Sequence, residues 1–153
     1  MTRSAPRPLA QRVQDTLDRL STEVDAWVAT ADPATGTPYL VPLSFLWDSG
    51  TLLLATSGTS PTVRNLRATG AVRLGIGPTR DVVLVEGTVE IVPLEALPAG
   101  HADLFAEKSG FDPRRSPSFV FLKVTPSLVQ AWRESNEIAG RDLMRDGTWL
   151  AAA

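Results

Sequence analysis

The stretch Leu52–Leu66 combines residue types that can bind an anion. An apolar run ends in a group of hydroxyl residues, and a helix is predicted to begin directly after it. Ser60 is a favourable N-cap, and Pro61 suits the first helical position. The first amides of a helix lack partners within the helix and lie at the positive end of its dipole, so they attract anions. The pattern therefore favours a phosphate site at the start of this helix.

Side chains of the same stretch could complete such a site. Arg64 lies about one turn into the predicted helix, where its guanidinium could make a charge-assisted contact. The hydroxyl donors nearby are Thr56, Ser57, Thr59, Ser60 and Thr62. The glycine-rich loop and lysine of a nucleotide triphosphate site are missing, and Gly75–Gly77 lacks the third glycine of a dinucleotide fingerprint. A capped helix after a solvated loop is the other interpretation, and these residues leave both open.

The composition excludes several classes of function. The chain has no cysteine, which excludes thiolate nucleophiles, disulfides and thiolate metal sites. The single histidine, His101, cannot form a His-rich metal site and has no Ser or Asp at a triad spacing. The net charge of −2 draws the chain to neither nucleic acid nor an anionic membrane. No segment approaches the roughly 18 apolar residues of a membrane span. We expect a soluble, cytoplasmic protein without a metal.

The length and periodicity predict one domain built mainly from strands. At 153 residues the chain has the size of a single domain, which we place at 9–153 after a flexible N-terminal arm at 1–8. Apolar residues at helical spacing predict an amphipathic helix from Leu9 to Leu20. Two more helices are predicted at Pro61–Thr69 and Pro93–Ser109. The predicted strands are Ala26–Ala31, Pro38–Trp47, Thr51–Thr56, Ala71–Ile76, Asp81–Val92, Ser118–Val124 and Leu128–Trp132, and Asp146-Gly147 signals a final hairpin.

Short turns join most of these strands, so the sheet is expected to be mostly antiparallel. Six to eight such strands favour a closed or partly closed barrel, because closure removes exposed sheet edges. Gly87 predicts a bulge or bend in its strand. Several carboxylates of the tail alternate with arginines and predict a salt-bridged surface rather than acid–base chemistry. They are Glu134, Glu137, Asp142 and Asp146.

The order and spacing of several short motifs resemble one family. Val41-Pro42-Leu43-Ser44-Phe45-Leu46-Trp47 is followed by Ser60-Pro61-Thr62-Val63-Arg64-Asn65-Leu66 and then by Val85-Glu86-Gly87-Thr88-Val89. The region from Thr30 to Val92 is similar to the FMN-binding split-barrel superfamily. That superfamily includes pyridoxamine 5′-phosphate oxidase-like proteins and actinobacterial flavin/deazaflavin oxidoreductases. The resemblance implies a mainly β fold with a few helices: an antiparallel, Greek-key-like split β-barrel of six to eight strands. It also implies a homodimer with two cofactor sites at the interface.

The resemblance further implies which residues bind the cofactor, FMN or coenzyme F420. The strand at Val41–Ser44 would lie against the ring system, and Ala55–Ser57 with the start of the helix would meet the ribityl chain and phosphate. A tryptophan near the C-terminus would approach from the partner subunit. The implied cofactor-binding residues are Val41, Pro42, Leu43, Ser44, Ala55, Thr56, Ser57, Ser60, Thr62, Arg64, Asn65 and Trp132. The family often has lysine where this chain has Arg64.

Two functions are compatible with this interpretation. The first is an oxidoreductase that transfers hydride to or from a small planar substrate through the cofactor, with no catalytic side chain required. The second is a split-barrel protein that holds flavin, haem or another planar ligand without turnover. The sequence alone does not choose between them, nor between FMN and F420.

Overall fold

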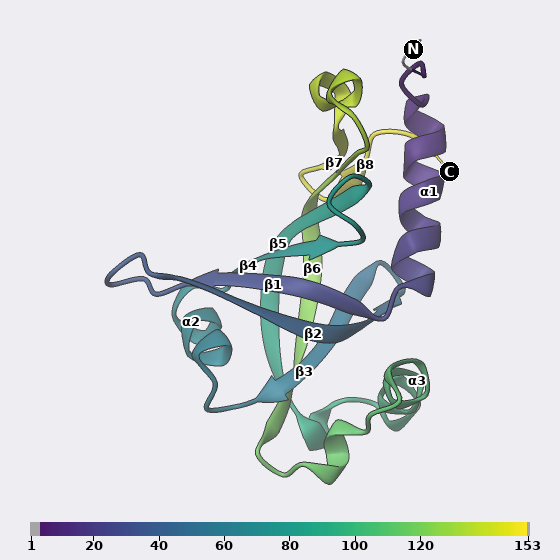
Figure 1. Cartoon of the computed structure of the whole chain (residues 1–153). Coiled ribbons are helices and arrows are strands. Elements are labelled where there is room, and N and C mark those ends of the chain that lie inside the picture. Colours follow the sequence, from purple (N-terminus) through teal and green to yellow (C-terminus); the bar gives the residue numbers. More distant parts are fainter. Residues whose placement is uncertain (1–3, 153) are drawn as a thin grey trace.

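A computed structural model describes residues 4–152. The α-helices are α1 (Leu9–Thr22), α2 (Pro61–Thr69) and α3 (Ala99–Ser109). The strands are β1 (Asp25–Ala31), β2 (Pro38–Asp48), β3 (Thr51–Ser57), β4 (Ala71–Ile76), β5 (Val82–Pro93), β6 (Phe119–Trp132), β7 (Asp142–Arg145) and β8 (Thr148–Trp149). Short 3₁₀ turns occur at Leu94–Ala96, Pro113–Arg115 and Ser135–Gly140. Figure 1 shows the strands crossing around one core, with α1 and α3 beside them.

The strands form an antiparallel barrel. The order is β3-β2-β1-β4-β5-β6-β7-β8, and β3 also pairs with β6, so β1 to β6 close on themselves. The neighbours β4-β1-β2-β3 have the Greek-key order, in which the fourth strand returns beside the first. Alternate residues point into the core, as in β5, where Val83 and Val85 are buried while Val82 and Leu84 are partly exposed. The predicted split β-barrel is confirmed.

The barrel is split between β2 and β3. These two strands pair only from Phe45 to Asp48 and from Thr51 to Leu54. The first part of β2, from Pro38 to Ser44, pairs with β1 and not with β3. At the end of β3, Ala55–Ser57 pairs with β6. Figure 1 shows α2 between the β1–β2 hairpin and the end of β3. The helix begins after its N-cap Ser60 and ends at Gly70, which has a φ of 64°, so its predicted bounds are confirmed.

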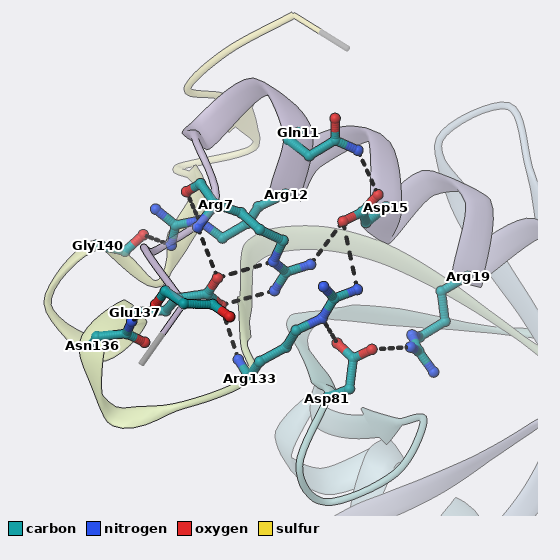
Figure 2. Close-up of polar contacts among 11 residues, drawn as sticks. Arg7, Gln11, Arg12, Asp15, Arg19, Asp81, Arg133, Asn136, Glu137 and Gly140 are labelled. Atoms are coloured by element: carbon teal, nitrogen blue, oxygen red, sulfur yellow. Dashed lines mark hydrogen bonds and ion pairs between the residues drawn. The ribbon is translucent and has the colours of Figure 1, made fainter. Parts of the chain in front are cut away.

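α1 is held on the barrel by charged side chains (Figure 2). Arg7 donates from Nε and Nη2 to the Glu137 carboxylate at 2.9 and 2.8 Å, and also reaches Asp15 at 2.9 Å. Glu137 is 3% exposed and additionally accepts from the amides of Arg7 and Arg133. The tail carboxylates were predicted to lie on a salt-bridged surface. The Glu137 carboxylate instead forms a buried ion pair with Arg7, which is 130 positions away in the chain. Within the predicted arm, Ser4 and Arg7 therefore contact the tail, and residues 1–3 are outside the described part.

Two predicted elements have different bounds. β6 is one long strand rather than two, because its bulge absorbs the break expected at Thr125-Pro126-Ser127. Between its pairings with β3 and β7, β6 is paired with no second strand in residues 4–152, so Pro126 removes no ladder bond on that side. The helix expected from Pro93 begins only at Ala99. α3 then covers the outside of β2, β3 and β6, where Phe105 meets Phe121 edge-on with 5.8 Å between ring centroids.

The irregularity predicted at Gly87 is confirmed, although the extra residue of the bulge lies on β6 and not on β5. The register of β5 against β6 shifts between Glu86 and Gly87, which leaves Ser127 unpaired. A β-carbon at Gly87 would overlap the carbonyl oxygen of Thr125. The glycine is therefore required by the close approach of the two backbones. Glu86, on the outward face of β5, forms an ion pair with Arg73 on β4.

Candidate functional site

The predicted phosphate helix borders a pocket of about 220 Å³ at the split of the barrel. The turn and first residues of β2 form one wall, and the first turn and a half of α2 forms the other. The lining residues are Asp32, Thr35, Thr37, Pro38, Tyr39, Pro61, Arg64 and Asn65. Antiparallel pairing of β1 with β2 places Tyr39 opposite Thr30 and so brings the hairpin over α2. Two of the twelve implied cofactor residues, Arg64 and Asn65, thus line one pocket.

Arg64 provides a cation at this pocket. Its side chain is exposed, and within residues 4–152 no carboxylate forms an ion pair with it. Asp32 lies on the opposite wall, where its carboxylate accepts from the amides of Ala34 and Thr35 at 2.8 and 3.0 Å. These backbone hydrogen bonds, with a smaller contribution from the charge of Arg64, lower the pKa of Asp32. The turn amides therefore satisfy Asp32, and Arg64 keeps its donors for a ligand.

Asn65 carries an unsatisfied polar atom. The residue is 3% exposed, and its Nδ2 donates to Oγ1 of Thr30 at 3.1 Å. Its Oδ1 is buried without a hydrogen-bond partner. A buried acceptor left unpaired costs about 1–3 kcal/mol, so such atoms mark places where a ligand or water completes a site.

The start of α2 offers fewer donors than the sequence predicted. The Ser60 hydroxyl accepts from the amide of Val63 at 3.2 Å, and its carbonyl accepts from the amide of Arg64 at 3.0 Å. Ser57 and Thr59 bond to each other at 3.1 Å, and Thr62 is only 1% exposed. In the described chain, the Thr62 amide is the donor of the first turn that remains without an acceptor. A phosphate at the start of α2 would therefore be bound mainly by the Arg64 guanidinium and less by the neighbouring Ser and Thr hydroxyls.

The strand Val41–Ser44 presents its side chains alternately. Val41 and Leu43 pack against the core, whereas Pro42 is exposed and Ser44 donates its hydroxyl to Asp25 at 2.8 Å. Leu40, one residue earlier, is 58% exposed. This part of β2 therefore has an apolar outward surface that begins at the pocket.

The remaining implied residues lie elsewhere. The Ala55 side chain packs under α3 with Ala102 and Phe105, on the outside of the barrel, and Thr56 is partly exposed on the opposite side of β3. Trp132 ends β6, with the Arg141 guanidinium 5.7 Å from its ring centroid. The eleven residue-to-residue steps from Phe121, which is opposite Ala55, to Trp132 span up to roughly 36 Å of strand. One chain therefore does not bring Trp132 to the α2 pocket.

Sequence reasoning missed the hairpin side of this pocket. The segment from Asp32 to Gly36 lies between two predicted strands, and Tyr39 lies within the second, so neither is predicted as part of a site. The turn sequence itself carries no signal of a ligand. Only the pairing of β1 with β2 places these residues beside α2, about 30 positions later in the chain.

Two other kinds of feature are missing from residues 4–152. No group of three or more His, Asp or Glu side chains is arranged to hold a metal ion there. None of the helices in that range has the length and apolar character needed to cross a membrane.

Comparisons with known proteins agree with the barrel. An F420 reductase superposes with a TM-score of 0.61 and 22% identity, covering 73% of this chain and 93% of that one. A FAD-binding protein from Mesorhizobium loti superposes with a TM-score of 0.60 and 21% identity, and the match covers 76% of this chain and 89% of that one. General Stress Protein 26 from Bacillus anthracis superposes with a TM-score of 0.59 and 15% identity, and the match covers 81% of this chain and 93% of that one. These identities establish the fold alone.

A comparison with curated proteins gave no match. A family model described as pyridoxamine 5′-phosphate oxidase, however, matches residues 14–133. That range runs from within α1 to the end of β6 and so includes the whole barrel, α2 and the pocket beside it. The chain belongs to the pyridoxamine 5′-phosphate oxidase family.

Proposed function

We propose that this protein is a homodimeric oxidoreductase that binds FMN or coenzyme F420 and transfers hydride to or from a small planar substrate. Family membership supports a flavin-type cofactor, as do the folds shared with an F420 reductase and a FAD-binding protein. The observation that carries the proposal is Arg64. It is an exposed cation without an ion-pair partner in the described chain, at a pocket bordered by the start of a helix.

The residues at the pocket fit the phosphate and ribityl end of such a cofactor. The Arg64 guanidinium would pair with the phosphate, which would also accept from the Thr62 amide. The unpaired Asn65 Oδ1 would accept a hydrogen bond from a hydroxyl of the ribityl chain. The apolar outward surface of Leu40 and Pro42 would face the ring system.

The pocket is too small for the whole cofactor, which supports a partner subunit. Its volume of about 220 Å³ is below the roughly 300–1,000 Å³ of typical ligand pockets. Tyr39 and Leu40, at the hairpin end of β2, are exposed apolar side chains next to it. A second copy packed here would enclose the ring and cover these side chains. Trp132, distant from the pocket in its own chain, would reach the partner's site.

When bound, the cofactor supplies the hydride chemistry. The chain's own residues bind and orient it: Arg64 and Asn65 fix the polar end, and β2 fixes the plane of the ring. Exclusion of water falls to the apolar side chains of β2 and of the partner subunit. No nucleophile or acid–base residue is required of the chain.

A fluorescence titration of cofactor-free protein with FMN and with F420 tests the proposal. Arg64→Ala is expected to weaken binding by about 1.5–3 kcal/mol, or roughly 10- to 150-fold in Kd, the range for a hydrogen bond to a charged group. Arg67→Ala is the matched control, because Arg67 is exposed on the same helix but does not line the pocket. Equal affinities of wild type and Arg64→Ala would place the phosphate elsewhere.

The alternative is a split-barrel protein that holds flavin, haem or another planar ligand without turnover. Because hydride transfer through the cofactor requires no catalytic side chain, the pocket-lining residues are equally compatible with such a protein. Tight cofactor binding without reduction of nitro, quinone or enone acceptors would favour it. Measurable turnover with any of these acceptors would favour the oxidoreductase.

A further inference from the structure

A second, larger hollow lies on the outward face of the barrel beside Trp27. Its volume is about 370 Å³, within the range of small-molecule sites. It is lined by Glu23, Asp25, Ala26, Trp27, Pro42, Gly75, Gly77 and Pro78. None of these residues lines the pocket at α2, so the hollow is a separate feature.

Strand register and two glycines create the hollow. Trp27 on β1 is paired with Pro42 on one side and with Gly75 on the other, so these three residues form one row across β2, β1 and β4. A β-carbon at Gly75 would make only ordinary contacts, at 3.7 Å from the Leu84 side chain and 4.0 Å from Cβ of Trp27, so a side chain is absent there without steric need. Gly77, with a φ of 84°, adds a second position without a side chain. The floor at Gly75 is therefore backbone without a side chain, whereas the Arg19 side chain covers Gly77, and the 54% exposed indole of Trp27 forms a wall.

The polar end of the hollow is negative. Asp25 accepts only the Ser44 hydroxyl, and no cation in residues 4–152 forms an ion pair with it. Glu23 is partly neutralised, because Arg19 reaches it at 3.3 Å. Arg19 itself runs against Gly77 and is shared with Asp81 at 2.7 Å (Figure 2). Asp25 is thus the carboxylate left to balance a positive charge on a ligand.

We infer that this hollow binds a planar aromatic cation, with its ring stacked on Trp27 above Gly75 and its positive group directed at Asp25. A cation is attracted to the face of an indole, and the missing side chain at Gly75 admits a flat ring where a larger residue would block it. The row of Trp27, Pro42 and Gly75 favours a flat ligand, and the Asp25 carboxylate favours a positively charged one.

This ligand would be the substrate, a part of the inference that rests on the proposed function. Pro42 both lines the hollow and belongs to the strand proposed to hold the cofactor ring. A ring stacked on Trp27 would therefore lie next to the cofactor ring. Planar heteroaromatic cations then form the substrate class to test first.

Isothermal titration of cofactor-free protein with 1-methylquinolinium tests the site, with naphthalene-2-carboxylate as an anionic ligand of similar shape. We expect the cation to bind and the anion not to bind at low ionic strength. Gly75→Val should fill the floor and weaken cation binding at least tenfold. Ala71→Val is the matched control, because Ala71 is exposed on the same face of β4 but outside the hollow. Asp25→Asn should weaken binding about two- to fivefold, as expected for an exposed charge pair.

Absence of cation binding, equal binding of the anion, or full binding by Gly75→Val would overturn the inference. Because these titrations contain no cofactor, they are independent of the Arg64 result. Failure here with normal FMN or F420 binding would refute only the hollow as a ligand site. Normal probe binding without cofactor binding would leave the hollow as a ligand site and refute its role in the proposed function.

Discussion

Replacing Glu137 by Gln tests the buried ion pair that joins the N-terminal segment to the tail. The substitution keeps the size of the side chain and one carbonyl acceptor but removes the charge that faces Arg7. The Arg7 guanidinium, followed by the backbone amides of Arg7 and Arg133, holds the pKa of Glu137 at about 2 instead of 4.5, although burial opposes this. Each pKa unit corresponds to 1.36 kcal/mol, so ionised Glu137 contributes on the order of 3 kcal/mol to stability at pH 7.

The pH dependence gives this prediction its sign. The folded-state pKa of Glu137 is lowered, so its contribution is complete above the unfolded value of about 4.5 and is lost as pH falls toward about 2. Glu137→Gln should therefore lower the unfolding free energy by about 2–3 kcal/mol at pH 7. The difference from wild type should shrink by more than half at pH 3. In a chain of this size the change at pH 7 corresponds to a fall in Tm of roughly 5–10 °C.

Urea denaturation followed by circular dichroism at pH 7 and at pH 3 measures both quantities. Glu134→Gln is the control, because Glu134 and its partner Arg80 are both exposed and such pairs contribute about 0–1 kcal/mol. The reasoning would be refuted by a Glu137→Gln variant within 0.5 kcal/mol of wild type at pH 7. A difference of equal size at both pH values would refute the assigned role of the charge.

Three further substitutions test the packing. Gly87→Ala forces a β-carbon against the Thr125 carbonyl and should cost about 1–3 kcal/mol in urea denaturation; an unchanged midpoint would contradict the bulge geometry. Gly100→Ala, in α3 with open space around the new β-carbon, should instead raise Tm, since Ala is favoured over Gly in helices by about 0.8–1.0 kcal/mol. Lys108→Met removes a cation 4.3 Å from the Phe45 ring centroid and a donor to the Leu20 carbonyl, and should cost about 1–2 kcal/mol by the same assay.

Local signals were sufficient for some elements. α2 could be predicted residue by residue, because Ser60, Pro61 and Gly70 act through their own backbone conformations and hydrogen bonds. The hairpin at Asp146-Gly147 has the same origin, since both residues have positive φ in the turn. The alternation of buried and exposed side chains along β5 also follows from the sequence, because one face of a strand in a barrel must be buried.

Other features depended on contacts that no local pattern encodes. Glu137 has the sequence context of a surface carboxylate, and only the packing of α1 against the tail places Arg7 beside it. The α2 pocket and the hollow at Trp27 are likewise made by residues brought together through the pairing of β1 with β2 and β4. Sequence by itself therefore determined most of the strands, the capped helix and the family. Tertiary structure decided which side chains share a site, because register and barrel closure, rather than distance along the chain, set which residues are neighbours.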